Sequence, residues 1–170
     1  GCDKPMEACF LFGSHASFYV DNGMGRYITP EEAKDIAGKN EAAGLVMQPF
    51  NSQYVGGMCS CCGDCCGILR SLKKQANPAA AVKSNYYAQI DQDACTGCET
   101  CLDRCQMEAI DMVEEKAVVN LKRCIGCGLC VSTCPTDAVR LMKKPEDQQY
   151  LPPETGMETY MRIAQERGKI

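Results

Sequence analysis

The pattern of apolar and polar residues predicts helices in the first half of the chain. One helix is expected over residues 5–23, where a proline suits the first turn. A second follows Thr29, because Thr29 and Glu32 form a capping-box motif and Gly44 supplies a stop signal. A third is expected over residues 68–75. The N-terminal region is therefore predicted to be rich in α-helix.

The second half alternates between short apolar runs and turn residues, which is typical of small strands. Together with one earlier segment, the predicted strands are residues 45–47, 86–90, 110–113, 117–120 and 138–142. Residues 110–113 and 117–120 are expected to form a central hairpin, and residues 86–90 and 138–142 are expected to be outer strands. Short helices are predicted after Cys98 and Cys127.

The chain ends in a helical pattern over about residues 155–167. Apolar residues recur there at helical spacing and form one stripe, made of Met157, Tyr160, Met161 and Ala164. This stripe predicts a C-terminal helix that docks on the rest of the protein.

Cysteine is the residue type that carries the chemistry, with 15 cysteines in 170 residues. Eight of them form two copies of one spacing, Cys-x2-Cys-x2-Cys-x3-Cys, placed 29 residues apart. The first copy is Cys95, Cys98, Cys101 and Cys105; the second is Cys124, Cys127, Cys130 and Cys134, followed by Pro135. This spacing is typical of cysteines that bind cubane [4Fe–4S] clusters.

The spacing also predicts which thiolates share a cluster. Three cysteines at x2 spacing lie on one tight loop, whereas the fourth lies past a turn and reaches the other cluster. The expected sets are Cys95, Cys98, Cys101 and Cys134 for one cluster, and Cys124, Cys127, Cys130 and Cys105 for the other. Zinc bound by four thiolates is the alternative, but it needs neither the third cysteine of each run nor the x3-Cys-Pro ending.

The repeat extends beyond the cysteines. Further pairs match at the same offset, namely Gly97 with Gly126, Glu108 with Asp137, and Ala109 with Ala138. A duplicated pattern of this kind predicts two halves related by a pseudo-two-fold axis. The expected fold class is α+β, with a ferredoxin-like two-cluster unit, an α-rich and Cys-rich N-terminal region, and a C-terminal helix.

On these motifs, residues 86–143 resemble a bacterial-type two-cluster [4Fe–4S] ferredoxin. The resemblance implies that all eight cysteines of the two runs are cluster ligands and that the unit passes single electrons. One position departs from the family's pattern, because Cys105 is followed by Gln106 where the family usually has proline.

A second group of five cysteines lies between residues 59 and 66. Cys59, Cys62 and Cys65 again have x2 spacing, so the segment predicts a third metal site with Cys66 as a fourth ligand. A third [4Fe–4S] cluster is the first interpretation of this site, and zinc is the alternative. Thiols or a disulfide without metal are the remaining interpretation.

The ligand choice at this third site is open in the sequence. The remote Cys2 or Cys9 offers a fourth thiolate in place of Cys66, and Cys61 with Cys66 offers a different set. A helix that begins near Gly67 would point its positive end at the cysteines and stabilise their charge.

The whole layout resembles the C-terminal part of cytoplasmic [4Fe–4S]-binding proteins of anaerobes. The matching stretches are residues 1–9, 25–33 and 43–46, followed by the cysteine-rich segment and the ferredoxin-like unit. The resemblance implies an upstream domain that this chain lacks, and it implies no particular reaction.

Composition excludes several function classes. The chain has 18 Lys and Arg against 22 Asp and Glu, a net charge of −4, and no basic block that would favour nucleic acid. No signal peptide or membrane-spanning run is visible, so the cysteines fit thiolate ligands in a reducing cytoplasm better than a disulfide scaffold. No phosphate-binding loop is present to predict a nucleotide or flavin.

Three parts are expected along the chain. Residues 1–80 form an α-rich region with a metal segment at residues 58–67, residues 81–145 form the two-cluster domain, and residues 146–170 form a tail. The expected function is electron transfer, as a carrier or as the electron-input module of a larger oxidoreductase with a redox partner protein, rather than as an enzyme on its own. An enzyme, or a redox or metal sensor, centred on Cys59–Cys66 is the alternative.

Overall fold

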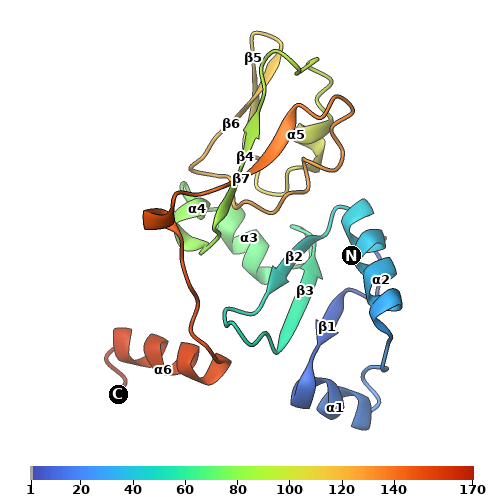
Figure 1. The fold of residues 1–170 in the computed structure, drawn as a ribbon, viewed down its shortest axis with the longest axis vertical. Helices are drawn as coiled ribbons and strands as arrows, with labels where there is room; N and C mark the ends of the chain where they lie inside the picture. The colour runs from blue at the N-terminus through green and yellow to red at the C-terminus, as the bar shows by residue number, and fades with distance from the viewer. Residues whose placement is uncertain (1) are drawn as a thin grey trace. The chain divides into compact units, whose positions relative to one another are not determined.

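The computed structural model describes residues 2–170 and combines short helices with small antiparallel sheets, so the protein is α+β. Its chain divides into two compact units that are interleaved in sequence (Figure 1). The unit that we call the cysteine unit comprises residues 2–3, 44–46 and 61–150. The terminal unit comprises residues 4–43, 47–60 and 151–170.

The terminal unit carries helices around one three-stranded sheet of order β1-β3-β2. Its elements are β1 (Cys9–Leu11), α1 (Gly13–Asp21), α2 (Pro30–Ala42), most of β2 (Val46–Pro49) and of β3 (Gly57–Cys61), and α6 (Gly156–Glu166). Strand β1 is antiparallel to β3, with Cys9 opposite Cys59.

The helix predicted over residues 5–23 is wrong in its first half, and only the second half is helical, as α1. Residues 9–11 form β1 instead, and a helix follows only from Gly13. The reason is tertiary, because Phe10 is buried and pairs with Met58 of β3, and this pairing overrides the local helical pattern. Strand β3 itself was not predicted, since the cysteine spacing there had indicated a loop.

The second predicted helix is confirmed as α2, together with its capping box. The hydroxyl of Thr29 accepts a hydrogen bond from the Glu32 N–H at 3.2 Å, and the Glu32 carboxylate accepts one from the Thr29 N–H at 3.0 Å. Local signals of this kind need no tertiary partner, which is why the sequence shows them.

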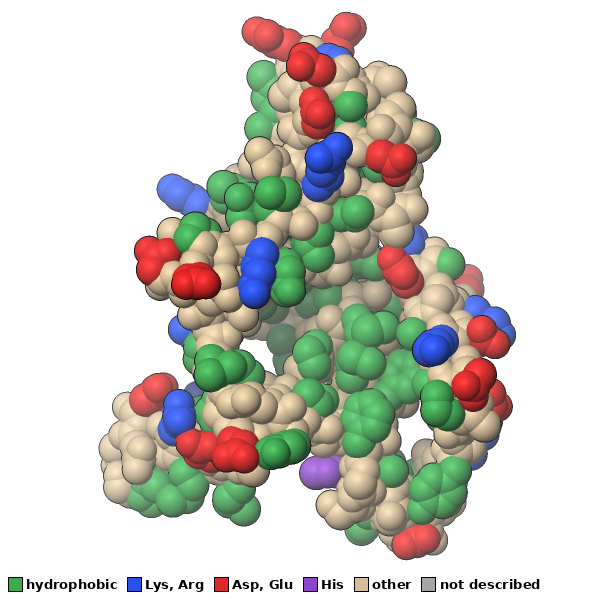
Figure 2. Space-filling view, viewed as in Figure 1, with side chains coloured by type: hydrophobic (Ala, Val, Ile, Leu, Met, Phe, Trp, Pro, Cys, Tyr) green, Lys and Arg blue, Asp and Glu red, His purple; other side chains and the backbone are tan. Residues whose placement is uncertain are grey.

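The predicted C-terminal helix is present as α6, and the segment before it is tied to the β2–β3 connection. The N–H groups of Gln53 and Tyr54 donate to the carbonyls of Pro153 and Glu154 at 2.8 and 2.9 Å. The apolar stripe is exposed at Met157, Tyr160 and Met161, and Figure 2 shows green side chains along α6. Docking through this stripe stays a prediction.

The cysteine unit is built from two two-stranded antiparallel sheets and short helices. Its elements are α3 (Gly67–Lys73), α4 (Pro78–Ala81), β4 (Tyr86–Ile90), α5 (Thr100–Arg104), β5 (Ile110–Val113), β6 (Lys116–Val119), β7 (Val139–Lys143) and a 3-10 turn (Glu146–Gln148). Strand β4 pairs with β7, and β5 forms a hairpin with β6. The predicted outer strands and central hairpin are thus confirmed to within one residue.

Backbone hydrogen bonds repeat at the 29-residue offset of the cysteines. The Asp91 N–H donates to the Ala138 carbonyl, and its counterpart, the Asn120 N–H, donates to the Ala109 carbonyl, both at 2.8 Å. Each bond joins one half of the repeat to the other, as a two-fold relation requires. The pseudo-two-fold itself stays a prediction, which these matched bonds support.

The two halves differ after their second cysteine. A helix follows Cys98 as predicted, but the residues after Cys127 form only turns, so the second short helix is wrong. The sequence Val131-Ser132-Thr133 stands where the first half has Leu102-Asp103-Arg104. The β-branched residues and serine have lower helix propensity than leucine and arginine, which accounts for the difference.

Two apolar clusters form the core of the cysteine unit. The first lies around Ala88, Ile110 and Val139 and includes three of the repeated cysteines. The second joins Leu69 and Leu72 of α3 to Met107, Ile125 and Leu129. None of the described helices has the length and apolar character needed to span a membrane.

Candidate metal centres

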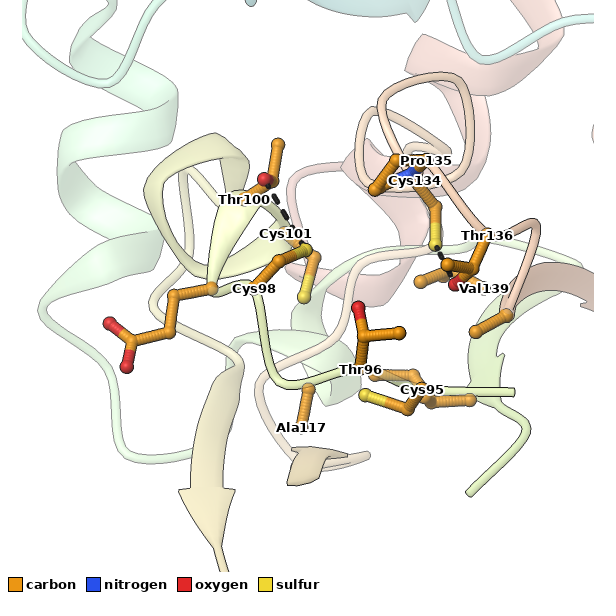
Figure 3. Close-up of a pocket in the computed structure, with 13 residues that line it drawn as sticks. Cys95, Thr96, Cys98, Thr100, Cys101, Ala117, Cys134, Pro135, Thr136 and Val139 are labelled. Carbon is orange, nitrogen blue, oxygen red and sulfur yellow. Dashed lines mark hydrogen bonds between the residues drawn. The ribbon is translucent and has the colours of Figure 1, made fainter. Parts of the chain in front are cut away.

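The first candidate site is a pocket lined by Cys95, Cys98, Cys101 and Cys134. The first three come from one run and Cys134 comes from the other, and Figure 3 shows their sulfurs directed into one space. The strand pairing explains why cysteines of both runs line this pocket, because β4 leads into Cys95 and its partner β7 follows Cys134. We call this site pocket 1.

Threonine residues give pocket 1 a polar rim. The Cys98 Sγ lies 3.5 Å from the Thr100 hydroxyl, and hydrogen bonds from Thr100 lower the pKa of Cys98. Burial raises the pKa of Cys134, but N–H groups of residues 136, 138 and 139 donate to its sulfur and bring the pKa below its usual range. Pocket 1 therefore stabilises negative charge on two of its four sulfurs.

The second candidate site, pocket 2, is lined by Cys105, Cys124, Cys127 and Cys130. Again three cysteines come from one run and the fourth from the other. The Cys105 Sγ accepts a hydrogen bond from the Ala109 N–H at 3.2 Å, and the Cys124 Sγ accepts one from the Ala88 N–H at 3.4 Å. Such N–H···S bonds fix the sulfur positions and influence the reduction potential of a bound cluster.

The walls of pocket 2 are more apolar than those of pocket 1. Apart from glycines and cysteines, its lining is Ala, Val, Ile, Leu and Met. Burial raises the pKa of Cys127 and raises that of Cys130 to about 12. A metal must displace the thiol protons in this pocket, and negative charge is costlier there than in pocket 1.

Matching glycines bring the backbone close to each cysteine loop. A Cβ on Gly97 would lie 2.3 Å from the Glu115 carbonyl oxygen, and one on Gly126 would lie 2.1 Å from that of Tyr86. Both glycines have positive φ, +70° and +67°. No other residue fits either position without displacing the neighbouring backbone, which is the β5–β6 turn at Gly97 and the start of β4 at Gly126.

The donor sets of both pockets fit a [4Fe–4S] cluster. Each offers four thiol sulfurs, the ligand type that iron–sulfur clusters require, inside a largely apolar enclosure. The structure thus brings together each of the two ligand sets expected from the spacing.

The cysteine-rich segment presents a different grouping from the one expected. The structure gathers Cys2, Cys62 and Cys65, whose sulfurs all lie within 4.8 Å of one another. Cys66 instead caps α3, because its Sγ accepts a hydrogen bond from the Leu69 N–H at 3.5 Å. Cys59 lies on β3 opposite Cys9. Cys2, which lies 60 residues before Cys62, was one of two remote alternatives to Cys66, and the spacing could not decide between them.

Gln106, the residue that departs from the ferredoxin pattern, connects this segment to pocket 2. Its side-chain oxygen accepts a hydrogen bond from the Gly63 N–H at 2.9 Å, and its amide nitrogen donates to the Gly44 carbonyl at 3.1 Å. Proline has no side-chain group that would make these bonds. The departure therefore has a structural role beside Cys105, one of the pocket 2 cysteines.

Arg123 is a structural residue that the sequence analysis missed. Its guanidinium donates to four backbone carbonyls, those of Met107, Glu108, Gln75 and Lys73, at 2.9–3.1 Å. These bonds join the end of α3 to the segment next to Cys124. No sequence motif indicates that an arginine next to a cysteine donates hydrogen bonds to distant backbone carbonyls.

Comparison with known families classifies the segment that contains both pockets. Residues 88–142 match a family model described as a 4Fe-4S dicluster domain. This segment is therefore a 4Fe–4S ferredoxin-like unit, as predicted, and the match indicates a [4Fe–4S] cofactor and iron–sulfur electron transfer. The match covers about a third of the chain. The comparison with curated proteins returned no match.

Proposed function

We propose that the protein transfers single electrons through two [4Fe–4S] clusters held by crossed ligand sets. Cys95, Cys98, Cys101 and Cys134 hold the cluster in pocket 1, and Cys124, Cys127, Cys130 and Cys105 hold the cluster in pocket 2. The observation that carries the proposal is that each pocket combines three cysteines of one run with the fourth of the other. A bound [4Fe–4S] cluster supplies one-electron redox chemistry.

The residues around the two pockets give them different electrostatic environments. Pocket 1 has threonine hydroxyls and N–H donors near its sulfurs and includes the exposed Cys98. Pocket 2 has an apolar lining that disfavours added negative charge. We expect the cluster in pocket 1 to have the higher reduction potential, so that electrons collect there. We also expect electrons to pass between this cluster and a partner protein through the exposed side of pocket 1.

Charge favours a basic surface on the redox partner. Residues 88–142 contain nine Asp and Glu against five Lys and Arg, so the chain's whole net charge of −4 lies in this segment. Figure 2 shows acidic side chains at the tip that carries the β5–β6 hairpin. An acidic carrier is steered toward a basic docking surface. The protein would act in a reducing, cytoplasmic compartment, as a carrier or as the electron-input module of a larger oxidoreductase.

Serine variants of two neighbouring cysteines test the crossing. Cys101 and Cys105 lie in one run but line different pockets. In anaerobically prepared protein, we expect about eight irons in the two pockets together. Cys105→Ser should alter the same EPR signal of the reduced protein as Cys124→Ser, and Cys101→Ser should alter the other signal. If Cys101→Ser and Cys105→Ser changed one and the same signal, the crossed arrangement would be wrong.

A redox titration followed by EPR tests the proposed order of potentials. The signal altered by Cys124→Ser should develop at lower potential than the signal altered by Cys95→Ser. The reverse order would contradict the argument from the pocket linings.

A further inference from the structure

The three gathered thiols of the cysteine unit form a group separate from both pockets. The Cys2 Sγ lies 3.6 Å from the Cys62 Sγ and 3.5 Å from the Cys65 Sγ. Cys62 is buried, Cys2 is half-buried and Cys65 is exposed. The group therefore lies at the surface, with one sulfur anchored inside.

These separations fit one metal ion. Thiolates at about 2.3 Å from a tetrahedral zinc ion stand about 3.8 Å apart, which is close to both of these sulfur–sulfur distances. In a cubane cluster each cysteine binds a different iron, so the cysteine sulfurs stand farther apart.

The two pockets provide an internal comparison for this geometry. Among the described residues, Cys2, Cys62 and Cys65 form a group of three ligand atoms that lie within 4.8 Å of one another, and no three of the eight pocket cysteines lie as close together. The same chain thus has two sites with widely spaced thiols and one with closely spaced thiols. This contrast separates a single-ion site from cluster sites.

We propose that Cys2, Cys62 and Cys65 bind one soft divalent metal ion, and that this ion is zinc. Thiolate sulfur is the ligand type that favours zinc, and binding would release the three thiol protons to solvent. No electron is transferred when the ion binds. The cysteine pattern of the sequence favoured a third cluster with Cys59 and Cys66, whereas the distances between the sulfurs favour the zinc alternative with Cys2.

The position of the group indicates a structural role beside pocket 2. Gly63 lies between two of the ligands, and its N–H donates to Gln106, the residue after Cys105. Cys66, one residue after the last ligand, caps α3, whose Leu69 packs in the same core as Cys105 and Cys124. An ion at the group would hold this loop in place against the pocket 2 ligands.

Metal analysis of cysteine variants tests the proposal. Protein purified anaerobically from cells grown with zinc and iron should contain about one zinc in addition to about eight irons per chain. Cys62→Ser and Cys65→Ser should each lose at least nine-tenths of the zinc and keep the irons. Cys65 is exposed, so its variant is expected to fold even if that of buried Cys62 is not. Cys9→Ser, outside the group, is the matched control and should keep the zinc.

Cobalt substitution gives a second readout that does not depend on activity. Cobalt in the zinc-exchanged protein should show intense thiolate-to-metal absorption, which Cys65→Ser weakens and Cys9→Ser leaves unchanged. Four additional irons and sulfides that depend on Cys65 would overturn the proposal in favour of a third cluster. A single extra iron, or protein that binds neither zinc nor cobalt at the group, would overturn it as well. Retention of eight irons in these variants separates this outcome from a failure of the electron-transfer proposal.

Discussion

The replacement Gly126→Ala tests how closely β4 approaches the loop that carries Cys124 and Cys127. A Cβ at residue 126 would lie 2.1 Å from the Tyr86 carbonyl oxygen, whereas real Cβ atoms essentially never lie closer than 3.0 Å to such an atom. The loop or the start of β4 must therefore move by about 0.9 Å. Tyr86 pairs with Lys143 of β7, so the displacement acts on the sheet that joins the two halves.

The size of the effect follows from a matched control, Gly128→Ala. Gly128 also has positive φ, +81°, but its Cβ would meet nothing closer than Leu141 at 3.7 Å. The left-handed conformation costs about 1–2 kcal/mol in both variants, partly offset by about 0.4–1 kcal/mol from a stiffer unfolded chain. Only Gly126→Ala adds the overpacking cost, for which we expect about 2 kcal/mol.

Anaerobic guanidinium denaturation of the iron-loaded variants measures this difference through the loss of cluster absorbance. With a slope of about 4 kcal/mol per M, the midpoint for Gly126→Ala should lie about 0.5 M below that for Gly128→Ala. Iron should also be lost first from pocket 2, which Gly126 lines. Equal midpoints for the two variants would refute the argument from close approach.

Three further variants address single interactions. Arg123→Ala should lower the free energy of unfolding by about 2–3 kcal/mol in guanidinium denaturation. Arg123→Lys should not restore this free energy, because an ammonium lacks the guanidinium fork, and full rescue by lysine would contradict the prediction. Gln106→Ala should cost about 1–3 kcal/mol and speed amide exchange at Gly63; unchanged exchange there would argue against the hydrogen bond. Thr29→Ala should cost about 1 kcal/mol by thermal denaturation followed by circular dichroism, with iron content unchanged; loss of iron would show a role beyond helix capping.

Local signals in the sequence predicted much of the cysteine unit. Alternating apolar residues located β4 and the β5–β6 hairpin, and the cysteine spacing predicted which thiols the structure gathers in each pocket. These features depend on neighbours within a few residues or on a duplicated motif, so a single sequence contains the information.

The features that the sequence did not predict depend on distant partners. Strand β1 exists because Phe10 pairs with Met58. The choice of Cys2 from the alternatives for the third thiol group depends on the fold, which returns the N-terminal segment to Cys62. Arg123 likewise bonds to carbonyls 48 and 50 residues away. Residue spacing gives no information about such contacts, since they are set only once the chain has folded.

The exchange of a fourth cysteine between the two runs has a consequence for the order of synthesis and assembly. Pocket 1 lacks a sulfur until Cys134 has been made, and pocket 2 lacks one unless the earlier run, with Cys105, is already in place. Neither pocket is complete in a nascent chain that contains only the first run. Cluster insertion would then cross-link the two runs. Like a disulfide, it would reduce the conformational entropy of the unfolded chain and stabilise the folded state by about 3–4 kcal/mol for each loop closed. Clusters would therefore be inserted late, and only chains whose two halves have already folded together would be stabilised by them.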